Sequence, residues 1–271
     1  MSLAMDFSGK TVVVVGGTSG INRGVAEQFA EHGAKVAVAS RSQDKVDDTV
    51  AALKKAGASA AMGFSVDVRD AEGVRAGLQS VHETFGDFDV LISGAAGNFP
   101  ALARSMSSNA FKSVIDIDVL GTFHVMNGAY PFLRKPGCSV INISAPQSFL
   151  PLEAQSHVCA AKAGVDMITR TLALEWGCDG IRINSVVPGP IDETEGMERL
   201  APTPELRDMT IQSVPLKRIG DKKDIANTCM FLGSDLASYI SGVVLPVDGA
   251  WSLAGCGGIG QFLGEFARSQ E

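Results

Sequence analysis

The sequence predicts an α/β fold in which helices cover both faces of one parallel sheet. Short apolar runs that end in glycine, such as TVVVVGG at 11–17, are typical of strands buried on both faces. These runs alternate with stretches of helical periodicity that are long enough to cross back over a sheet. Glycine is plentiful, with 30 residues, which suits many tight strand-to-helix turns. Together these observations predict βαβ units with right-handed crossovers.

The first half of the chain contains four strand–helix pairs. The first two helices each stop at a glycine, Gly33 and Gly57, the residue best suited to end a helix. The run SAAMGFSVDV is less apolar and predicts a weaker strand. In order, the expected elements are strand 11–17, helix 21–32, strand 34–40, helix 43–56, strand 59–68, helix 70–85, strand 89–97 and helix 109–134.

The second half repeats the pattern with one interruption. The expected elements are strand 139–145, helix 153–177, strand 181–189, helix 221–237 and strand 242–249. Residues 190–215 are polar, contain prolines and are irregular in charge. A segment this long before the next helix is the best candidate for a mobile lid.

Composition bounds the architecture and excludes some partners. The chain has 271 residues, 45% of them hydrophobic and only 20% charged, which is enough for one large core. No linker or repeat divides it, so we expect one domain over residues 1–271. The net charge of −7 and the lack of a Lys/Arg block argue against nucleic acid and anionic membranes as partners.

Cysteine and histidine patterns argue against two kinds of site. The five cysteines form no CxxC pair and the four histidines lack the spacing of metal ligands, so neither disulfides nor a metal are expected. No apolar stretch is long enough to span a bilayer, and no signal peptide is recognisable. The final RSQE is not a peroxisomal SKL-type tail. These features predict a cytoplasmic protein.

The loop after the first strand predicts a phosphate-binding site. VVVVGGTSGINRG places Gly16 and Gly20 between a buried strand and a helix. Glycines allow a sharp turn, and the free N–H groups at the start of the helix attract a pyrophosphate. The flanking strand and helix strengthen a signal that is weak alone. We therefore expect a Rossmann-type, doubly wound dinucleotide-binding fold, with a tight turn that binds nothing as the lesser alternative.

The tip of the second strand indicates which dinucleotide binds. It carries no Asp or Glu to accept from a ribose hydroxyl, and ends instead in Ser40 and Arg41, which suit a 2′-phosphate. The sequence thus favours NADPH/NADP⁺ over the NAD pair, unless Arg41 is only a solvated cation. Asp67 and Val68, after the third strand, are expected near the adenine, where Asp67 either binds the adenine amino group or caps the next helix.

Motifs along nearly the whole chain resemble the short-chain dehydrogenase/reductase family. In order, they are VVGGTSGIN, SGAAG, NISA, the helix that contains Lys162, VVPGPI and VDGAW. The resemblance implies a homotetramer packed through helices 109–134 and 153–177. The further cofactor-binding residues that it implies are Thr18, Ser19, Ile21, Gly94, Ala95, Ala96, Lys162, Pro188, Gly189, Ile191 and Thr194.

The catalytic residues depart from the family pattern. The family's Tyr, four residues before its Lys, falls on Val158. Its Ser falls on Ala145 and its Asn on Asp118, so only Lys162 matches. An ordinary alcohol dehydrogenase or ketoreductase would be handicapped without a positioned acid on oxygen. The third glycine of the family's loop is also replaced, by Asn22.

One subgroup fits these departures. The stretch GAAGNFPALARSMSSNAFKSVIDIDVLGTF at 94–123 is similar to the 2,4-dienoyl-CoA reductases, particularly the peroxisomal type. That type similarly has Asp in place of the Asn, lacks the Tyr, and carries a His where His157 stands here. The resemblance implies NADPH-dependent reduction of 2,4-dienoyl-CoA to an enoyl-CoA, in β-oxidation of unsaturated fatty acids.

This reaction tolerates the loss of the tyrosine. Hydride adds to the far carbon, the negative charge spreads to the thioester oxygen, and a held water returns a proton to carbon. The site therefore needs donors for a dienolate and a well-placed hydride source. We expect Asp118 and Lys162 to hold and polarise the water, with Asp118 balancing the charge of Lys162. Asp248, after the last strand, is a second acidic candidate, unless it only forms the Asp-Gly turn.

Other residues are expected beside the acyl-CoA substrate. Asn98 and Phe99 lie at the carboxyl edge of the sheet, where such folds bind ligands. Ser144 is a candidate donor to the thioester oxygen, although a bond to backbone is the commoner role for such a hydroxyl. His157 is either a general acid or, more often for a lone histidine, structural. The cations considered for the CoA phosphates are Arg104, Lys112 and Arg199.

Two other functions fit the cofactor site. One is a keto- or enoyl-thioester reductase, and the missing Tyr argues against the ketoreductase. The other is a catalytically inactive NADP-binding sensor or scaffold. The retained Lys162 and Asp118 argue against an abandoned site, which need not keep a complementary charged pair.

Overall fold

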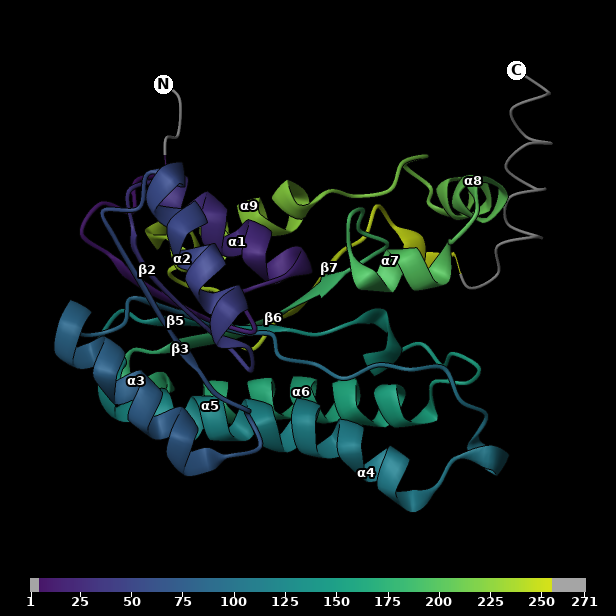
Figure 1. The fold of residues 1–271 in the computed structure, drawn as a ribbon, viewed down its shortest axis with the longest axis horizontal. Coiled ribbons are helices and arrows are strands. Elements are labelled where there is room, and N and C mark those ends of the chain that lie inside the picture. The colour runs from purple at the N-terminus through teal and green to yellow at the C-terminus, as the bar shows by residue number, and fades with distance from the viewer. Residues whose placement is uncertain (1–4, 255–271) are drawn as a thin grey trace.

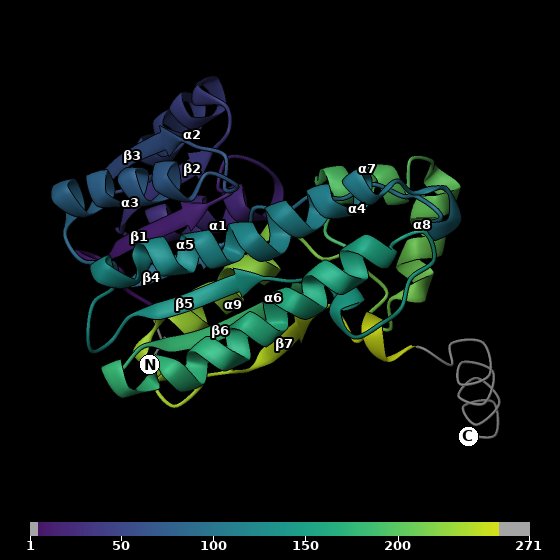
Figure 2. The same cartoon turned by 90° about the horizontal axis from the view of Figure 1, so that it is seen from below.

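The computed structural model describes residues 5–254, except for the side chains of residues 199 and 200. Its centre is a seven-stranded sheet in the order β3-β2-β1-β4-β5-β6-β7, parallel throughout (Figures 1 and 2). The strands are β1 (Thr11–Val15), β2 (Lys35–Ser40), β3 (Ala60–Ser65), β4 (Val90–Ser93), β5 (Ser139–Ile143), β6 (Arg182–Pro188) and β7 (Val244–Val247). The order runs outwards from β1 and β4 in opposite directions, which confirms the predicted doubly wound fold.

Helices cover both faces of the sheet (Figures 1 and 2). One layer holds α1 (Gly20–Glu31), α2 (Gln43–Ala56) and α9 (Lys222–Gly233). The opposite layer holds α3 (Ala71–Phe85), α4 (Ser108–Ile115), α5 (Gly121–Ala129) and α6 (Ser156–Glu175). Two shorter helices, α7 (Glu195–Leu200) and α8 (Pro204–Ser213), lie beyond the end of β6.

The apolar core is divided in two by the sheet. Val12 and Val14 of β1 pack on the α1 side with Phe29 of α1, whereas Val13 and Val15 pack on the α3 side. Both faces of the strand are therefore buried, and this explains why β1 is a continuous apolar run rather than an alternating one. Within residues 5–254, no helix combines the length and the hydropathy that a membrane span requires.

Residues 190–215, where the sequence indicated no clear helix, contain two short ones. This segment contains α7 and α8, each begun by a threonine that accepts from a backbone N–H, Thr194 from Met197 and Thr203 from Leu206. No residue of α8 is fully buried, so the helix shows little of the core-facing pattern that marks the other helices. Capping, rather than hydrophobic patterning, marks these helices in the sequence.

The helix expected over 109–134 is also interrupted. Between α4 and α5 the chain makes one π-helical turn, Asp116–Leu120. Such wider turns are rare and concentrate at functional sites. Here the turn contains Asp118, whose side chain is fully buried.

Candidate active site

The carboxyl ends of β1, β2 and β4 border a cavity of about 380 Å³. Gly16 has a φ of +81°, and a Cβ there would lie 2.8 Å from the backbone nitrogen of Ala95, so only glycine fits. α1 begins just behind this turn, and its N-cap residue Ser19 makes no side-chain capping bond. The predicted loop residues that line the cavity are Gly16, Thr18, Ser19 and Gly20. Ile21 instead packs against the core.

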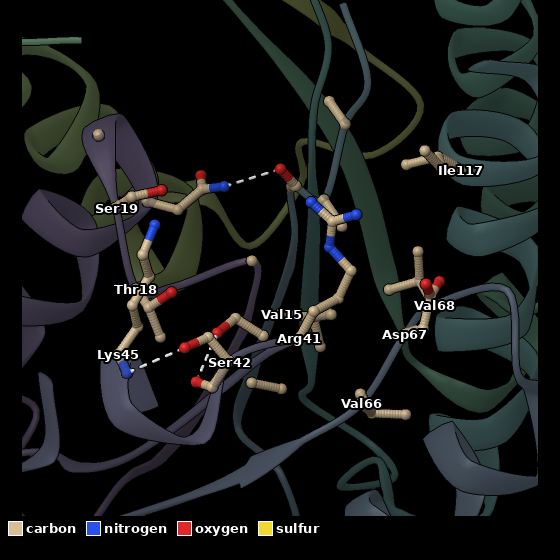
Figure 3. A pocket seen from close by; sticks show the side chains of 18 of the residues that line it. Val15, Thr18, Ser19, Arg41, Ser42, Lys45, Val66, Asp67, Val68 and Ile117 are labelled. Carbon is tan, nitrogen blue, oxygen red and sulfur yellow. Dashed lines mark hydrogen bonds between the residues drawn. The ribbon is translucent and has the colours of Figure 1, made fainter. Parts of the chain in front are cut away.

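Two cations border the cavity beyond β2. Arg41 follows the strand and Lys45 lies in the first turn of α2, and both line the cavity together with Ser40 (Figure 3). Ser42 caps α2 by accepting from the backbone nitrogen of Lys45 at 3.4 Å. The sequence interpretation named Ser40 and Arg41 but missed Ser42 and Lys45. The sequence did contain a signal for Lys45, because a lysine in the first turn of α2 is close in sequence to Arg41.

Asp67 lines the same cavity but does not cap α3, so the capping alternative is wrong. The cap is Asp70, which accepts from the backbone nitrogen of Gly73 at 3.0 Å. Asp67 instead accepts from the guanidinium of Arg69, with 2.6 Å between Oδ2 and Nη2. This side-chain hydrogen bond, helped by the Arg69 backbone, lowers the pKa of Asp67 to about 2. Asp67 thus forms an ion pair with Arg69 where it borders the cavity.

The remaining predicted cofactor residues divide into two groups. Val68, Gly94, Ala95 and Ala96 line the cavity. Pro188 ends β6, and Gly189 follows it so close to Asp248 that a Cβ on Gly189 would lie 2.7 Å from the Asp248 Cα. Ile191 is buried and pairs with Gly220 in an isolated bridge.

The start of α7 reaches back to the glycine loop. A Cβ on Gly20 would lie 3.9 Å from the methyl group of Thr194. The Thr194 hydroxyl donates to the carbonyl of Ile191 at 2.8 Å and accepts from Met197. Glu195, which the sequence interpretation missed, also lines the cavity. The segment predicted to act as a lid thus borders the cofactor cavity.

The predicted pair of Asp118 and Lys162 lies together below the carboxyl edge of the sheet. The Lys162 Nζ is 3.2 Å from Asp118 Oδ2, and both side chains are almost wholly buried, at 8% and 0% exposed. Nζ also donates to the carbonyl of Ile143 at 3.2 Å, and Asp118 Oδ1 accepts from the backbone nitrogen of Gly97 at 2.7 Å. A buried pair is stable only when such further bonds complete it. This arrangement explains how the α6 lysine is accommodated among small apolar residues.

The position of the family tyrosine is apolar. Val158 is buried and packs with Val114 of α4 and Ala161. One residue earlier, His157 is fully buried, and its ring contacts the ring of Phe99 with 4.4 Å between centroids. Neither ring nitrogen of His157 has a hydrogen-bond partner among the described residues.

Ser144 is also buried without a partner for its hydroxyl in the described part of the chain. The alternative that this hydroxyl bonds to backbone is therefore not what the structure shows. The side chain of Asn98, by contrast, accepts from Gln155 Nε2 at 3.1 Å. Ser144 thus keeps a donor free at the end of β5, which is compatible with the predicted role beside a thioester.

Asp248 takes the turn-forming role that was its alternative. Its Oδ1 accepts from the backbone nitrogen of Ala250 at 2.9 Å and its Oδ2 from that of Ser252 at 2.8 Å. Both carboxylate oxygens are thus engaged by the turn after β7. A part for Asp248 in a water network stays a prediction.

Asn22 joins the two sides of the cofactor cavity. Its Nδ2 donates to the carbonyl of Gly94 at 2.9 Å, which connects α1 to the end of β4. A Cβ on Gly94 would lie 2.2 Å from that nitrogen, so the Asn22 amide leaves room only for glycine at position 94. The sequence interpretation treated Asn22 as a departure from the glycine pattern and did not predict this bond.

Asn22→Ala is expected to weaken NADPH binding about three- to tenfold with little change in kcat, because a net hydrogen bond of about 0.5–1.5 kcal/mol then no longer fixes the cavity walls. The dissociation constant would be measured by NADPH fluorescence. Gln28→Ala is the matched control, since Gln28 is also a buried amide of α1, but its Nε2 donates to Glu31 and it does not line the cavity. Equal NADPH affinity in wild type and Asn22→Ala would contradict the expectation.

Comparison with known proteins decides the family. The family model described as "Enoyl-(Acyl carrier protein) reductase" matches residues 15–252. A solved short-chain type dehydrogenase/reductase from Mycobacterium ulcerans superposes with a TM-score of 0.87 at 30% identity, covering 92% of this chain and 91% of its own. The chain belongs to the short-chain dehydrogenase/reductase family. It is accordingly an oxidoreductase, as the motifs predicted.

Two curated members of the short-chain dehydrogenase/reductase family that are similar to this chain share one name. A protein of Arabidopsis thaliana is 41% identical over 89% of this chain and 84% of its own length. A protein of Rattus norvegicus is 43% identical over 89% of this chain and 82% of its own. Both are named "Peroxisomal 2,4-dienoyl-CoA reductase [(3E)-enoyl-CoA-producing]". The resemblance to this subgroup is therefore confirmed.

Proposed function

We propose that the protein reduces 2,4-dienoyl-CoA to an enoyl-CoA with NADPH, in the β-oxidation of unsaturated fatty acids. The observation that carries the proposal is the buried Asp118–Lys162 pair in a site with no tyrosine. Such a site lacks a phenolic acid for a carbonyl oxygen, and its buried lysine ammonium supports a role in stabilising a dienolate instead. The names of the relatives support the same reaction.

The cavity fits NADPH in shape and charge. The sharp turn at Gly16 and the uncapped start of α1 suit a pyrophosphate, and Arg41 and Lys45 suit a 2′-phosphate. Bound there, NADPH supplies the hydride. Pro188, Gly189, Ile191 and Thr194 would hold its nicotinamide end, and Lys162 would bind the adjacent ribose.

In the proposed mechanism Asp118 and Lys162 act on the substrate's side. The ammonium of Lys162 stabilises the dienolate, and Asp118 holds Lys162 in place. The pair also orients the water that protonates carbon, and Ser144 donates to the thioester oxygen. Asn98 and Phe99 border the acyl group, and residues 190–215 close over it.

Assembly and location are further parts of the proposal. Large apolar side chains are exposed on the helices of the α4–α6 layer, which supports a homotetramer packed through them: Phe111, Leu120, Phe123 and Met167. For the CoA phosphates, Arg104 is a candidate, whereas Lys112 already pairs with Asp116. The Arg199 side chain lies outside the described residues. We retain a cytoplasmic location, although the plant and rat relatives are named peroxisomal.

The deciding experiment follows the loss of NADPH absorbance with a short 2,4-dienoyl-CoA, beside acetoacetyl-CoA and crotonyl-CoA. Turnover of the dienoyl substrate alone is the expected result. Activity only with acetoacetyl-CoA or crotonyl-CoA would replace the proposal with a keto- or enoyl-thioester reductase. Tight NADPH binding without any turnover would favour the sensor.

A further inference from the structure

His157 is a buried group that the mechanism above does not use. It lies in the first turn of α6, has no exposed surface, and has no described partner for either ring nitrogen. A neutral imidazole has one donor and one acceptor nitrogen, and buried polar atoms in native proteins are nearly always paired. An imidazole left unpaired in the free protein therefore requires a physical reason.

The loop Gly97–Asn98–Phe99 connects this histidine to the catalytic pair. The Gly97 nitrogen donates to Asp118, Asn98 accepts from Gln155, and the Phe99 ring contacts His157. Consecutive Cα atoms are about 3.8 Å apart, so the three residues span at most roughly 8 Å. His157 and the Asp118–Lys162 pair thus lie at the two ends of one short loop at the carboxyl edge of the sheet.

The same region contains other unpaired polar atoms. Ser144 Oγ at the end of β5 and Gln155 Oε1 just before α6 are both buried without a described hydrogen-bond partner. Further along β5 and α6, Asn142 Nδ2 donates to Thr169 at 2.8 Å, although Asn142 Oδ1 and Asp166 Oδ1 are also buried without a described partner. Most of the buried side-chain atoms without a described partner nevertheless lie on residues 144–157, between the end of β5 and the first turn of α6.

We propose that the imidazole of His157 donates a hydrogen bond to a carbonyl oxygen of the bound acyl thioester. The acceptor is either the thioester carbonyl or the first amide of the pantetheine arm, two carbonyl groups of the same hydrogen-bonding chemistry. The proposal rests on the proposed function for the kind of ligand. His157 then binds substrate in a site where Val158 replaces the tyrosine, and Phe99 holds its ring in place.

His157→Phe tests this role, because phenylalanine keeps the ring contact with Phe99 and removes both nitrogens. We expect kcat/KM for the dienoyl-CoA to fall about 10- to 100-fold, with unchanged NADPH affinity. The melting temperature should stay the same or rise, because the variant removes buried polar atoms that lack partners. His157→Gln, which restores a donor, should recover most of the activity.

The matched control is His82→Phe. His82 also packs on a phenylalanine, Phe132, with 5.0 Å between ring centroids, but its Nε2 already contacts Asp87 at 3.0 Å. It lies in α3, away from the cavity and the catalytic pair. This variant should keep full activity and is expected to lose, not gain, thermal stability.

Two ligands distinguish the acceptors. A dienoyl S-ethyl thioester has no pantetheine amide, so an equal loss with this substrate assigns the bond to the thioester carbonyl. A loss confined to the CoA substrate assigns it to the pantetheine. Full kcat/KM of His157→Phe with both ligands would overturn the proposal, as would a lower melting temperature together with weaker NADPH binding.

A binding measurement separates this inference from the proposed function. Calorimetry would titrate 3-enoyl-CoA into the protein with NADP⁺, without any turnover. If wild-type protein fails to reduce dienoyl-CoA, the proposed function fails, yet weaker 3-enoyl-CoA binding by His157→Phe still supports the hydrogen bond. Equal affinity of the two proteins for 3-enoyl-CoA refutes it, whatever the activity.

Discussion

Lys162→Met is expected to lower kcat about 10²- to 10³-fold and to reduce the free energy of unfolding by about 3–5 kcal/mol. The catalytic loss follows because the variant removes the positive charge that faces the dienolate. The loss of stability has a separate cause. Asp118 is fully buried, and without Lys162 only the Gly97 nitrogen bonds its carboxylate. The rate would be measured with saturating NADPH, and the stability by urea denaturation.

Lys10→Met is the matched control for stability. Lys10 Nζ also lies 3.2 Å from a buried carboxylate, that of Asp89, the same separation as in the Lys162 pair. However, Lys10 is half exposed, and Asp89 keeps bonds from Arg134 and from the Thr11 nitrogen. We expect a loss of at most about 1 kcal/mol and normal activity.

A second variant separates the two effects of Lys162. Asp118→Asn combined with Lys162→Met leaves no unpaired charge, so it should be more stable than Lys162→Met alone while remaining inactive. If Lys162→Met were as active as wild type with normal NADPH affinity, the assignment of the pair to catalysis would be wrong. If it were as stable as wild type, the pair would not be the compensated buried charge described here.

Hydrophobic pattern predicted the elements that face the core. The strands and the longer helices were found because both cores of the sheet require apolar residues at regular spacing. The hydrophobic pattern did not predict elements whose conformation does not depend on burying apolar side chains. α8 buries no side chain and depends on the Thr203 cap. The π-helical turn at Asp116–Leu120 adjusts the position of one aspartate and leaves no periodic signal.

The candidate site could be predicted only in part for a similar reason. The roles of Gly16 and Gly20 could be predicted from the sequence, since a sharp turn before a helix requires glycine. The association of Asp118 with Lys162 came from resemblance, because no local spacing connects a π-helical turn with α6. The bond from Asn22 to Gly94 and the contact of His157 with Phe99 join segments far apart in sequence. Such contacts follow from tertiary packing, which residue types alone do not specify.

The cofactor preference yields the last prediction. Ser40→Asp combined with Arg41→Ala is expected to shift the ratio of kcat/KM for NADPH over that for NADH by at least about 100-fold towards NADH. Both residues line the cavity at the end of β2. Hydrogen bonds to charged groups contribute about 1.5–3 kcal/mol, so loss of the Arg41 bond to a 2′-phosphate alone accounts for about 10- to 100-fold. The new carboxylate accepts from a ribose 2′-hydroxyl and repels a phosphate, which adds to the shift.

Lys54→Ala provides the control for net charge. Lys54 lies in the last turn of α2, whereas Arg41 and Lys45 lie at its start. This variant therefore removes a cation from the same helix but not from the cavity. It should leave the NADPH/NADH ratio unchanged, while Lys45→Ala should lower it several-fold. Both ratios must be measured at one ionic strength, because salt screens the exposed cations. A wild-type protein that preferred NADH would refute the assignment at once. A double variant with an unchanged ratio would mean that Lys45, rather than the tip of β2, discriminates between the two cofactors.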